Sequence, residues 1–104
     1  MPEKTKVDYD EKNDDLFLRM GREKYEASIE IGDFIVDFSK KERIIGLEIM
    51  NASRNLNVSK TLLNTIKNAS MMVSQGNRAM VINALLVLEN KQEIRTAIPI
   101  PVCG

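Results

Sequence analysis

Carboxylates are the side chains of this sequence best suited to chemistry, since a pair of them can transfer protons or hold a hard cation through oxygen ligands. We take Asp10, Asp37 and Glu48 as candidates, because the last two lie in neighbouring expected strands. There they could face each other across a hairpin, or bracket Lys40 or Arg43. The plainer interpretation, which we favour, is that these groups cap turns and form surface ion pairs. A metal-dependent carboxylate hydrolase is therefore an alternative function only.

The missing residue types narrow the chemistry further. The 104 residues include no histidine and no tryptophan, and the one cysteine is Cys103. This composition excludes histidine-based catalysis, His/Cys zinc sites and an intrachain disulfide. A general base near neutral pH would have to be a carboxylate whose pKa is raised by burial or by a like charge. We expect no cofactor, and we expect Cys103 to be an ordinary exposed thiol.

A two-residue period of apolar side chains runs from Val7 to Met50, which is the pattern of half-buried strands. The segments between these strands are short. Since a parallel crossover needs about a dozen residues or more, the short links favour hairpins. We expect the first half of the chain to form an antiparallel meander.

The middle of the chain changes to a helical period. We expect one helix over residues 60–68, capped by Ser59, and a helical turn over residues 52–56. Ser53 is interpreted as a cap at the entry to that turn rather than as a nucleophile. The longer helix would place Lys60 and Lys67 on one exposed face without an acidic residue. That face could contact an anion such as nucleic acid, but a solvated helix face is the simpler expectation.

The last third returns to strands, at residues 69–75, 78–88 and 93–102, which predicts an antiparallel hairpin sheet. Pro99 and Pro101 stand two residues apart in the last strand. Both lack an amide hydrogen on the same strand edge, so that edge should stay unpaired and the strand should end the sheet.

The strand over residues 79–88 is apolar on both faces, which is unusual for a strand covered on one side only. We expect the helix to cover one face and the meander or a second copy of the chain to cover the other. The sequence thus predicts a homodimer, with Asn83 forming a polar bridge across it because an unsatisfied buried amide costs about 1–3 kcal/mol. The expected interface residues are Val81, Asn83, Leu85 and Val87.

Charge is balanced overall but not along the chain. There are 15 basic and 15 acidic residues in total, yet residues 1–52 hold 9 basic and 13 acidic ones, and residues 53–104 hold 6 and 2. Either the two halves complement each other within the fold or across a dimer, or the second half offers a basic surface to an anionic partner. With no apolar run of about 18 residues and no secretory signal, we expect a cytoplasmic protein without a membrane segment.

Four short motifs in the first half resemble a prokaryotic family known as domain of unknown function twenty-two eighty-three. The resemblance covers about residues 7–55. In order, the motifs read Val7-Asp8-Tyr9-Asp10, Asp15-Leu16-Phe17-Leu18, Ile35-Val36-Asp37-Phe38, and Ile45-Gly46-Leu47-Glu48-Ile49-Met50-Asn51-Ala52-Ser53. The resemblance implies a small domain of a meander and a helix without an established activity. Family members encoded beside small toxin-like proteins imply an antitoxin-like role with a small protein partner.

Together these observations predict a single domain over residues 1–104, of class α+β, with an antiparallel meander, one or two short helices and a C-terminal hairpin sheet. The missing catalytic residue types favour a non-enzymatic interaction module, homodimeric and able to bind a small protein partner. Nucleic-acid binding through Lys60 and Lys67 is the remaining alternative.

Overall fold

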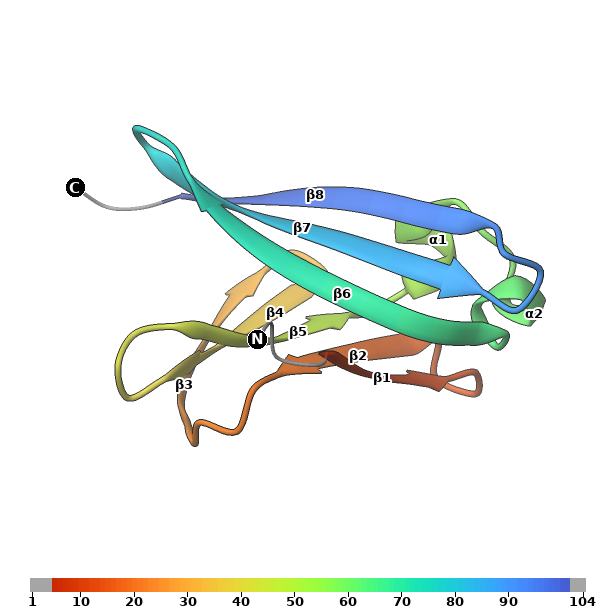
Figure 1. Cartoon of the computed structure of the whole chain (residues 1–104), viewed down its shortest axis with the longest axis horizontal. Coiled ribbons are helices and arrows are strands. Elements are labelled where there is room, and N and C mark those ends of the chain that lie inside the picture. The colour runs from red at the N-terminus through yellow and green to blue at the C-terminus, as the bar shows by residue number, and fades with distance from the viewer. Residues whose placement is uncertain (1–4, 102–104) are drawn as a thin grey trace.

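The structure, a computed structural model, describes residues 5–101, which form eight strands and two short helices (Figure 1). The strands are β1 (Thr5–Asp10), β2 (Asp15–Met20), β3 (Tyr25–Ile31), β4 (Phe34–Ser39), β5 (Ile44–Ile49), β6 (Ile66–Gln75), β7 (Ala79–Leu88) and β8 (Glu93–Pro101). The helices are α1 (Ala52–Leu56) and α2 (Lys60–Leu63). Neither helix of this part of the chain is long and apolar enough to cross a membrane. The fold is dominated by its sheet, within the broad α+β or β class.

All eight strands belong to one antiparallel sheet in the order β3-β4-β5-β2-β1-β6-β7-β8. The first five strands are therefore not a simple meander, because β5 inserts between β4 and β2 and pairs with both. The link over residues 21–24 does not close a hairpin between β2 and β3. Burial explains this order. Five of the six residues of β5 are buried, so it needs a neighbour on each side, whereas β3 is exposed along nearly its whole length and lies at the edge.

The sheet bends sharply between β1 and β6 into a half-barrel of two layers, with β6–β8 lying across β1–β5 (Figure 1). At the bend, the register pairs Thr5 with Ala69, the one pair between β1 and β6 in the described part of the chain. The two helices lie at one end of the layers, close to the turn between β7 and β8.

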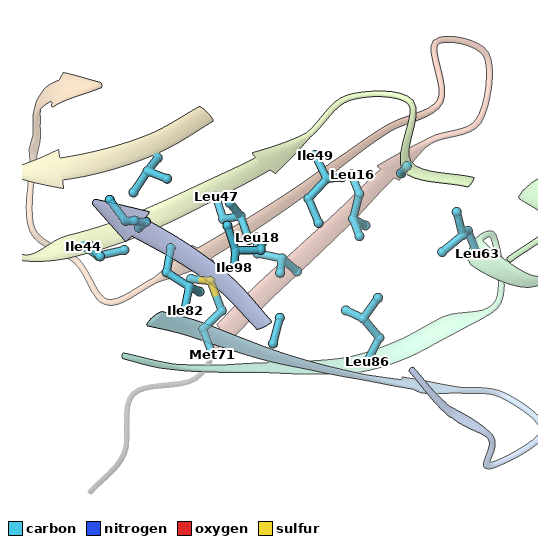
Figure 2. Packing of buried hydrophobic residues seen from close by; sticks show 14 residues of the cluster. Leu16, Leu18, Ile44, Leu47, Ile49, Leu63, Met71, Ile82, Leu86 and Ile98 are labelled. Carbon is cyan, nitrogen blue, oxygen red and sulfur yellow. The ribbon is translucent and has the colours of Figure 1, made fainter. Parts of the chain in front are cut away.

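The core lies between the two layers. Figure 2 shows Leu16, Leu18, Leu47 and Ile49 of the first layer pointing toward Ile82, Leu86 and Ile98 of the second. All seven side chains are at most 4% exposed. Burial of a leucine or isoleucine side chain stabilises a fold by about 1.5–3 kcal/mol, so this contact holds the layers together.

The predicted helix over residues 60–68 is wrong in its second half. Ser59 caps α2 as expected, its Oγ accepting a hydrogen bond from the Leu62 amide at 3.1 Å. The helix ends at Leu63, however, and Lys67 lies in β6. Pairing with β7 prevails over the helical spacing there, since Ile66 registers with Leu88 at the start of a long ladder. A helix of one turn has little stability of its own to oppose that pairing.

The C-terminal hairpin sheet is confirmed, with β6 and β8 on either side of β7. The proline-bearing strand β8 ends the sheet, as Pro99 and Pro101 predict. The turn between β6 and β7 is one residue longer than expected, and the Gly76 amide closes it by donating to the Ala79 carbonyl at 2.9 Å. Val102, expected to end the last strand, and Cys103, expected to be an exposed thiol, lie outside the described residues.

The two apolar faces of β7 have different surroundings. Ile82 and Leu86 are buried in one cluster with side chains of the first layer, and Leu63 of α2 belongs to that cluster too. Leu88, also buried, lines a hollow with Val58 and Leu62 at the helical end of the sheet. The first layer and the helical segment therefore cover the same face of β7, whereas the sequence expectation placed them on opposite faces. Val81, Leu85 and Val87 on the opposite face are only half-buried. Within residues 5–101, no segment lies over that face (Figure 1).

Candidate functional site

The uncovered side of β6, β7 and β8 is the first candidate site, and we call it the outer face. Its members follow from the alternation of side chains along three paired strands, whose register places equivalent residues side by side. They are Asn68, Ser70, Met72 and Ser74 of β6, Val81, Asn83, Leu85 and Val87 of β7, and Glu93, Arg95, Ala97 and Pro99 of β8. All four residues expected at a dimer interface therefore share this face.

A hollow of about 540 Å³ adjoins the middle of the outer face, and Thr5, Met71, Ala84 and Thr96 complete its lining. Its lining from this face is Ser70, Met72, Asn83, Leu85, Arg95 and Ala97. Met72 is 69% exposed, the largest value among the large apolar side chains of the described chain. An exposed methionine beside an apolar strand is adaptable contact surface, because its side chain is flexible and polarizable.

Four polar side chains of the outer face form two pairs. The Asn83 amide donates to Ser74 Oγ at 3.3 Å, and the guanidinium of Arg95 lies 3.0 Å from the carboxylate of Glu93. Asn83 is exposed rather than buried, so within one chain its amide does not carry the cost expected from the sequence. The two charges of the outer face therefore offset each other, so the face can be buried in an interface without leaving an unpaired charge.

A second cluster joins the β1–β2 turn to the start of α1 through the carboxylate of Asp14. Its Oδ1 accepts the Tyr9 hydroxyl at 2.6 Å and the Ser53 amide at 3.1 Å, while its Oδ2 accepts the Ser53 hydroxyl at 2.6 Å. The Asp14 carbonyl also accepts the Ala52 amide at 2.9 Å. Asp14 is buried and adopts a left-handed backbone conformation with φ of 56°, which aspartate tolerates better than most residues.

Hydrogen bonding keeps Asp14 ionised. Burial acts to raise the pKa of this carboxyl, but the bonds from Ser53 and Tyr9, with Lys60 nearby, outweigh it and lower the pKa below its ordinary value. Conversely, the pKa of the Tyr9 phenol is raised, first by burial and then by the Asp14 carboxylate. The cluster is therefore a structural clamp with a fixed negative charge.

Ser53 is not the helix cap that the sequence suggested. The capping position of α1 belongs to Asn51, whose side chain makes no capping hydrogen bond, and Asp14 supplies the acceptor for the first turn from 39 residues away. Asp33, in the β3–β4 turn, holds the same helix by accepting from Asn55 and Arg54 at 3.0 and 3.2 Å.

Sequence reasoning did not single out Tyr9 and Asp14 as a pair. The signal was present in the Tyr9-Asp10 and Ala52-Ser53 portions of the family motifs, which the fold brings together.

The candidate carboxylates Asp37 and Glu48 lie on one side of the first layer, on the paired strands β4 and β5. Asp37 is paired with Gly46 on the neighbouring strand, and its side chain lies over that glycine. Its Oδ1 accepts a hydrogen bond from the Ser28 hydroxyl at 2.8 Å. A methyl group at Gly46 would come within 2.8 Å of Asp37 Oδ2, so the glycine makes room for this carboxylate. Glu48 is half-buried, and burial followed by repulsion from Asp15 and Asp37 raises its pKa.

Asp10, the third candidate carboxylate, belongs to a turn. It accepts the side-chain amide of Asn13 at 2.7 Å and the backbone amide at 3.2 Å, and the pKa of Asp10 is lowered by these bonds. Among residues 5–101, no group of three or more His, Cys, Asp or Glu side chains is placed to hold a metal ion.

The basic residues considered from the sequence are dispersed. Lys60 lies in α2 and Lys67 in β6, so they do not share the helix face that we expected. Arg43 is not bracketed by Asp37 and Glu48; its guanidinium lies 3.8 Å from the carboxylate of Glu23.

Comparison with known proteins agrees with the motifs of the first half. A family model described as protein of unknown function (DUF2283) matches residues 6–53. A protein of Methanosarcina mazei named "Putative hypoxanthine phosphoribosyltransferase" is 34% identical over 89 residues, which cover 84% of this chain and 72% of that protein. An uncharacterized protein of Methanocaldococcus jannaschii is 38% identical over 66 residues, covering 62% of this chain and 57% of that protein. No solved structure matches the chain. The chain belongs to the family of proteins of unknown function DUF2283.

Proposed function

We propose that the protein is a non-enzymatic assembly module of the cytoplasm that forms a homodimer through the outer face of β6, β7 and β8. The observation that carries the proposal is the outer side of β7, where Val81, Leu85 and Val87 form an apolar row that no described segment covers. These three side chains are half-buried, and the exposed Met72 on the neighbouring strand extends the apolar surface of the face. Apolar surface left uncovered on a sheet is a mark of interaction sites.

The outer face is suited to a second copy of itself. Asn83 lies near the middle of β7, the central strand of this layer, with Val81 and Leu85 two residues to either side. A two-fold axis at Asn83 with the two β7 strands antiparallel would place each Leu85 near Val81 of the other copy, as an isologous interface requires. The two Asn83 amides would then meet on the axis and form the polar bridge expected from the sequence.

The test is sedimentation velocity at tens of micromolar with variants on and off the outer face. Met72→Lys changes a 69% exposed side chain and Leu85→Lys places a charge in the apolar row. Phe17→Lys is the matched control, because Phe17 is 39% exposed on the other layer. We expect dimers of the wild type and the control, and monomers of the two outer-face variants. A monomeric wild type would overturn the proposal, as would a monomeric Phe17→Lys.

A small protein partner, suggested by family members encoded beside small toxin-like proteins, extends this proposal. Such a partner would bind the dimer, so it should co-purify with the wild type from the native host. If the purified native complex contains this chain alone, the dimer is the functional assembly.

Two enzymatic alternatives can be separated from the proposal by thermal shift, because a ligand that binds only the folded state raises apparent stability. The name of the Methanosarcina mazei relative suggests phosphoribosyl transfer, for which hypoxanthine and a phosphoribosyl donor are the probes. The shared side of Asp37 and Glu48 suggests a metal-dependent hydrolase, for which magnesium, manganese and calcium are the probes. We expect no shift with any of them. A saturable shift would replace assembly with catalysis as the preferred function.

A further inference from the structure

The two free edges of the sheet differ in their chemistry. At one end, β8 carries Pro99 and Pro101, which donate no hydrogen bond to an incoming strand. At the other end, β3 contains no proline and, among residues 5–101, pairs only with β4. An unprotected edge presents free amides and carbonyls that can pair with another strand.

The free edge of β3 is regular over five residues. The register with β4 shifts between Tyr25 and Ala27, so this irregularity ends the usable edge at its start. The turn at Gly32, where φ is 57°, ends it on the other side. Between them, residues 27–31 follow an uninterrupted antiparallel register, and Ile29 in their middle is 45% exposed.

The hairpin turn determines which backbone groups are free. Ile31 and Phe34 flank a two-residue loop, and the residues that flank such a loop form a hydrogen-bonded pair. Because hydrogen-bonded and non-bonded pairs alternate in an antiparallel ladder, Ile29 also bonds to β4. The amides and carbonyls of Ser28 and Glu30 therefore point away from the sheet and are available to a further strand.

We propose that β3 pairs antiparallel with β3 of a second copy, in the register centred on Ile29. In this register Ile29 faces its own copy, Ala27 faces Ile31, and Ser28 faces Glu30. Ser28 and Glu30 then form the hydrogen-bonded pairs, so the free backbone groups match. The three apolar residues stay on one side of the extended sheet and the polar residues on the other, as the two-residue period requires.

The glutamates select this register. A centre at Ser28 would place Glu26 opposite Glu30, and a centre at Glu30 would place that residue opposite its own copy. Like charges that face each other directly across two strands are destabilising. A centre at Ala27 would have to run through the irregularity beside Tyr25. Of the symmetric registers, the one at Ile29 keeps five residues paired without a direct like-charge contact.

The edge of β3 is separate from the outer face used for the proposed dimer, because the two lie at opposite ends of the strand order. Pairing through both would join dimers into tetramers or longer assemblies. Five residues of edge bury less surface than a typical stable interface of about 1,600 Å². The edge contact is therefore expected to be the weaker of the two and to grow with protein concentration.

Disulfide trapping tests both the contact and its register. In a Cys103→Ser background, Ile29→Cys places two thiols at a non-hydrogen-bonded pair, where Cα atoms about 4.5 Å apart allow a disulfide. Ala27→Cys is the matched control, because in this register it faces Ile31 and not itself. We expect Ile29→Cys to cross-link at least tenfold faster than Ala27→Cys under mild oxidation at 200 µM or so.

A mixture supplies the second readout. An equal mixture of Ala27→Cys and Ile31→Cys should cross-link about half as fast as Ile29→Cys, because about half of the random pairs are mixed, although neither variant does so alone. Equal rates for all single variants would overturn the register, and the absence of cross-linking in every sample would overturn the contact itself.

The same series in a Met72→Lys background separates this inference from the proposed function. If the outer face forms the dimer and β3 does not pair, Met72→Lys yields monomers and no Ile29→Cys cross-link. If β3 pairs and the outer face does not, Met72→Lys leaves both the assembly and the cross-link unchanged.

Discussion

At the scale of single residues, Asp14 connects the β1–β2 turn to the start of α1, 39 residues later. It receives three side-chain or backbone hydrogen bonds from Tyr9 and Ser53 while buried. We expect Asp14→Asn to lower the free energy of unfolding by about 2 kcal/mol at pH 7, since hydrogen bonds to a charged group contribute about 1.5–3 kcal/mol. Urea denaturation measures the loss, and Glu11→Gln in the exposed β1–β2 turn is the control that should change nothing.

The pH dependence of stability provides a further check on Asp14. Its folded pKa lies below its ordinary value, so the carboxylate contributes stability that is present above the ordinary pKa and is lost as pH falls toward the folded pKa. The difference between wild type and Asp14→Asn should therefore shrink as pH drops from 5 to about 3. A difference that stays constant over this range would contradict the role of the charge.

Glu48 should show the opposite sign. Its pKa is raised by burial and by the charges of Asp15 and Asp37, so its ionised form is disfavoured in the folded chain. Glu48→Gln should raise the free energy of unfolding by about 0.5 kcal/mol at pH 7, within the range of repulsive pairs on a sheet. The gain should vanish at acidic pH, where the wild-type carboxyl is protonated. Thermal melts at several pH values measure it, and a loss of stability at pH 7 would refute the sign.

At the scale of elements, strands β4 and β5 are fitted to each other by Gly46. Gly46→Ala would push a methyl group against Asp37 and disturb its hydrogen bond with Ser28. We expect the substitution to cost about 1–2 kcal/mol, as overpacking usually does. In a double-mutant cycle, Asp37→Ala should recover most of that cost, because it removes Oδ2, the atom at 2.8 Å, and leaves only the Cβ at 3.3 Å. Additive effects of the two substitutions would show that the contact is not the cause.

Sequence periodicity predicted most strands correctly, but it failed to predict the conformation of one segment. The strands of both halves follow the two-residue period, and the cap of α2 at Ser59 follows from residue type alone. The segment at Lys67 fits a helical spacing equally well. Its conformation was decided by the long ladder with β7, which is a contact with residues about 20 positions later.

At the scale of the whole molecule, the three-stranded layer covers the five-stranded layer on one side and leaves its own outer face open. If that face forms the proposed dimer, association stabilises the fold by mass action. The midpoint of thermal unfolding should then rise with protein concentration between 5 and about 200 µM, and more steeply for the wild type than for Met72→Lys, which keeps only the weaker contact proposed for β3. Parallel shifts in both proteins would contradict a dimer through this face.

The features of the candidate sites also differ in whether the sequence could predict them. From the sequence, the two apolar sides of β7 and the unpaired edge at Pro99 could be predicted, because each depends on alternation or on a missing amide hydrogen within one strand. The clamp at Asp14 could not, since its acceptors and donors lie 39 residues apart and meet only when the β1–β2 turn packs on α1.

The sequence by itself thus determined the strands, the helix cap, the proline edge, the family motifs and the lack of histidine chemistry, all of which are local or compositional properties. Only the tertiary structure decided that β5 lies between β4 and β2, that the first layer and the helical segment cover the same face of β7, and that Lys60 and Lys67 lie in different elements. These are pairings between distant segments, and their outcome depends on which faces can be buried together.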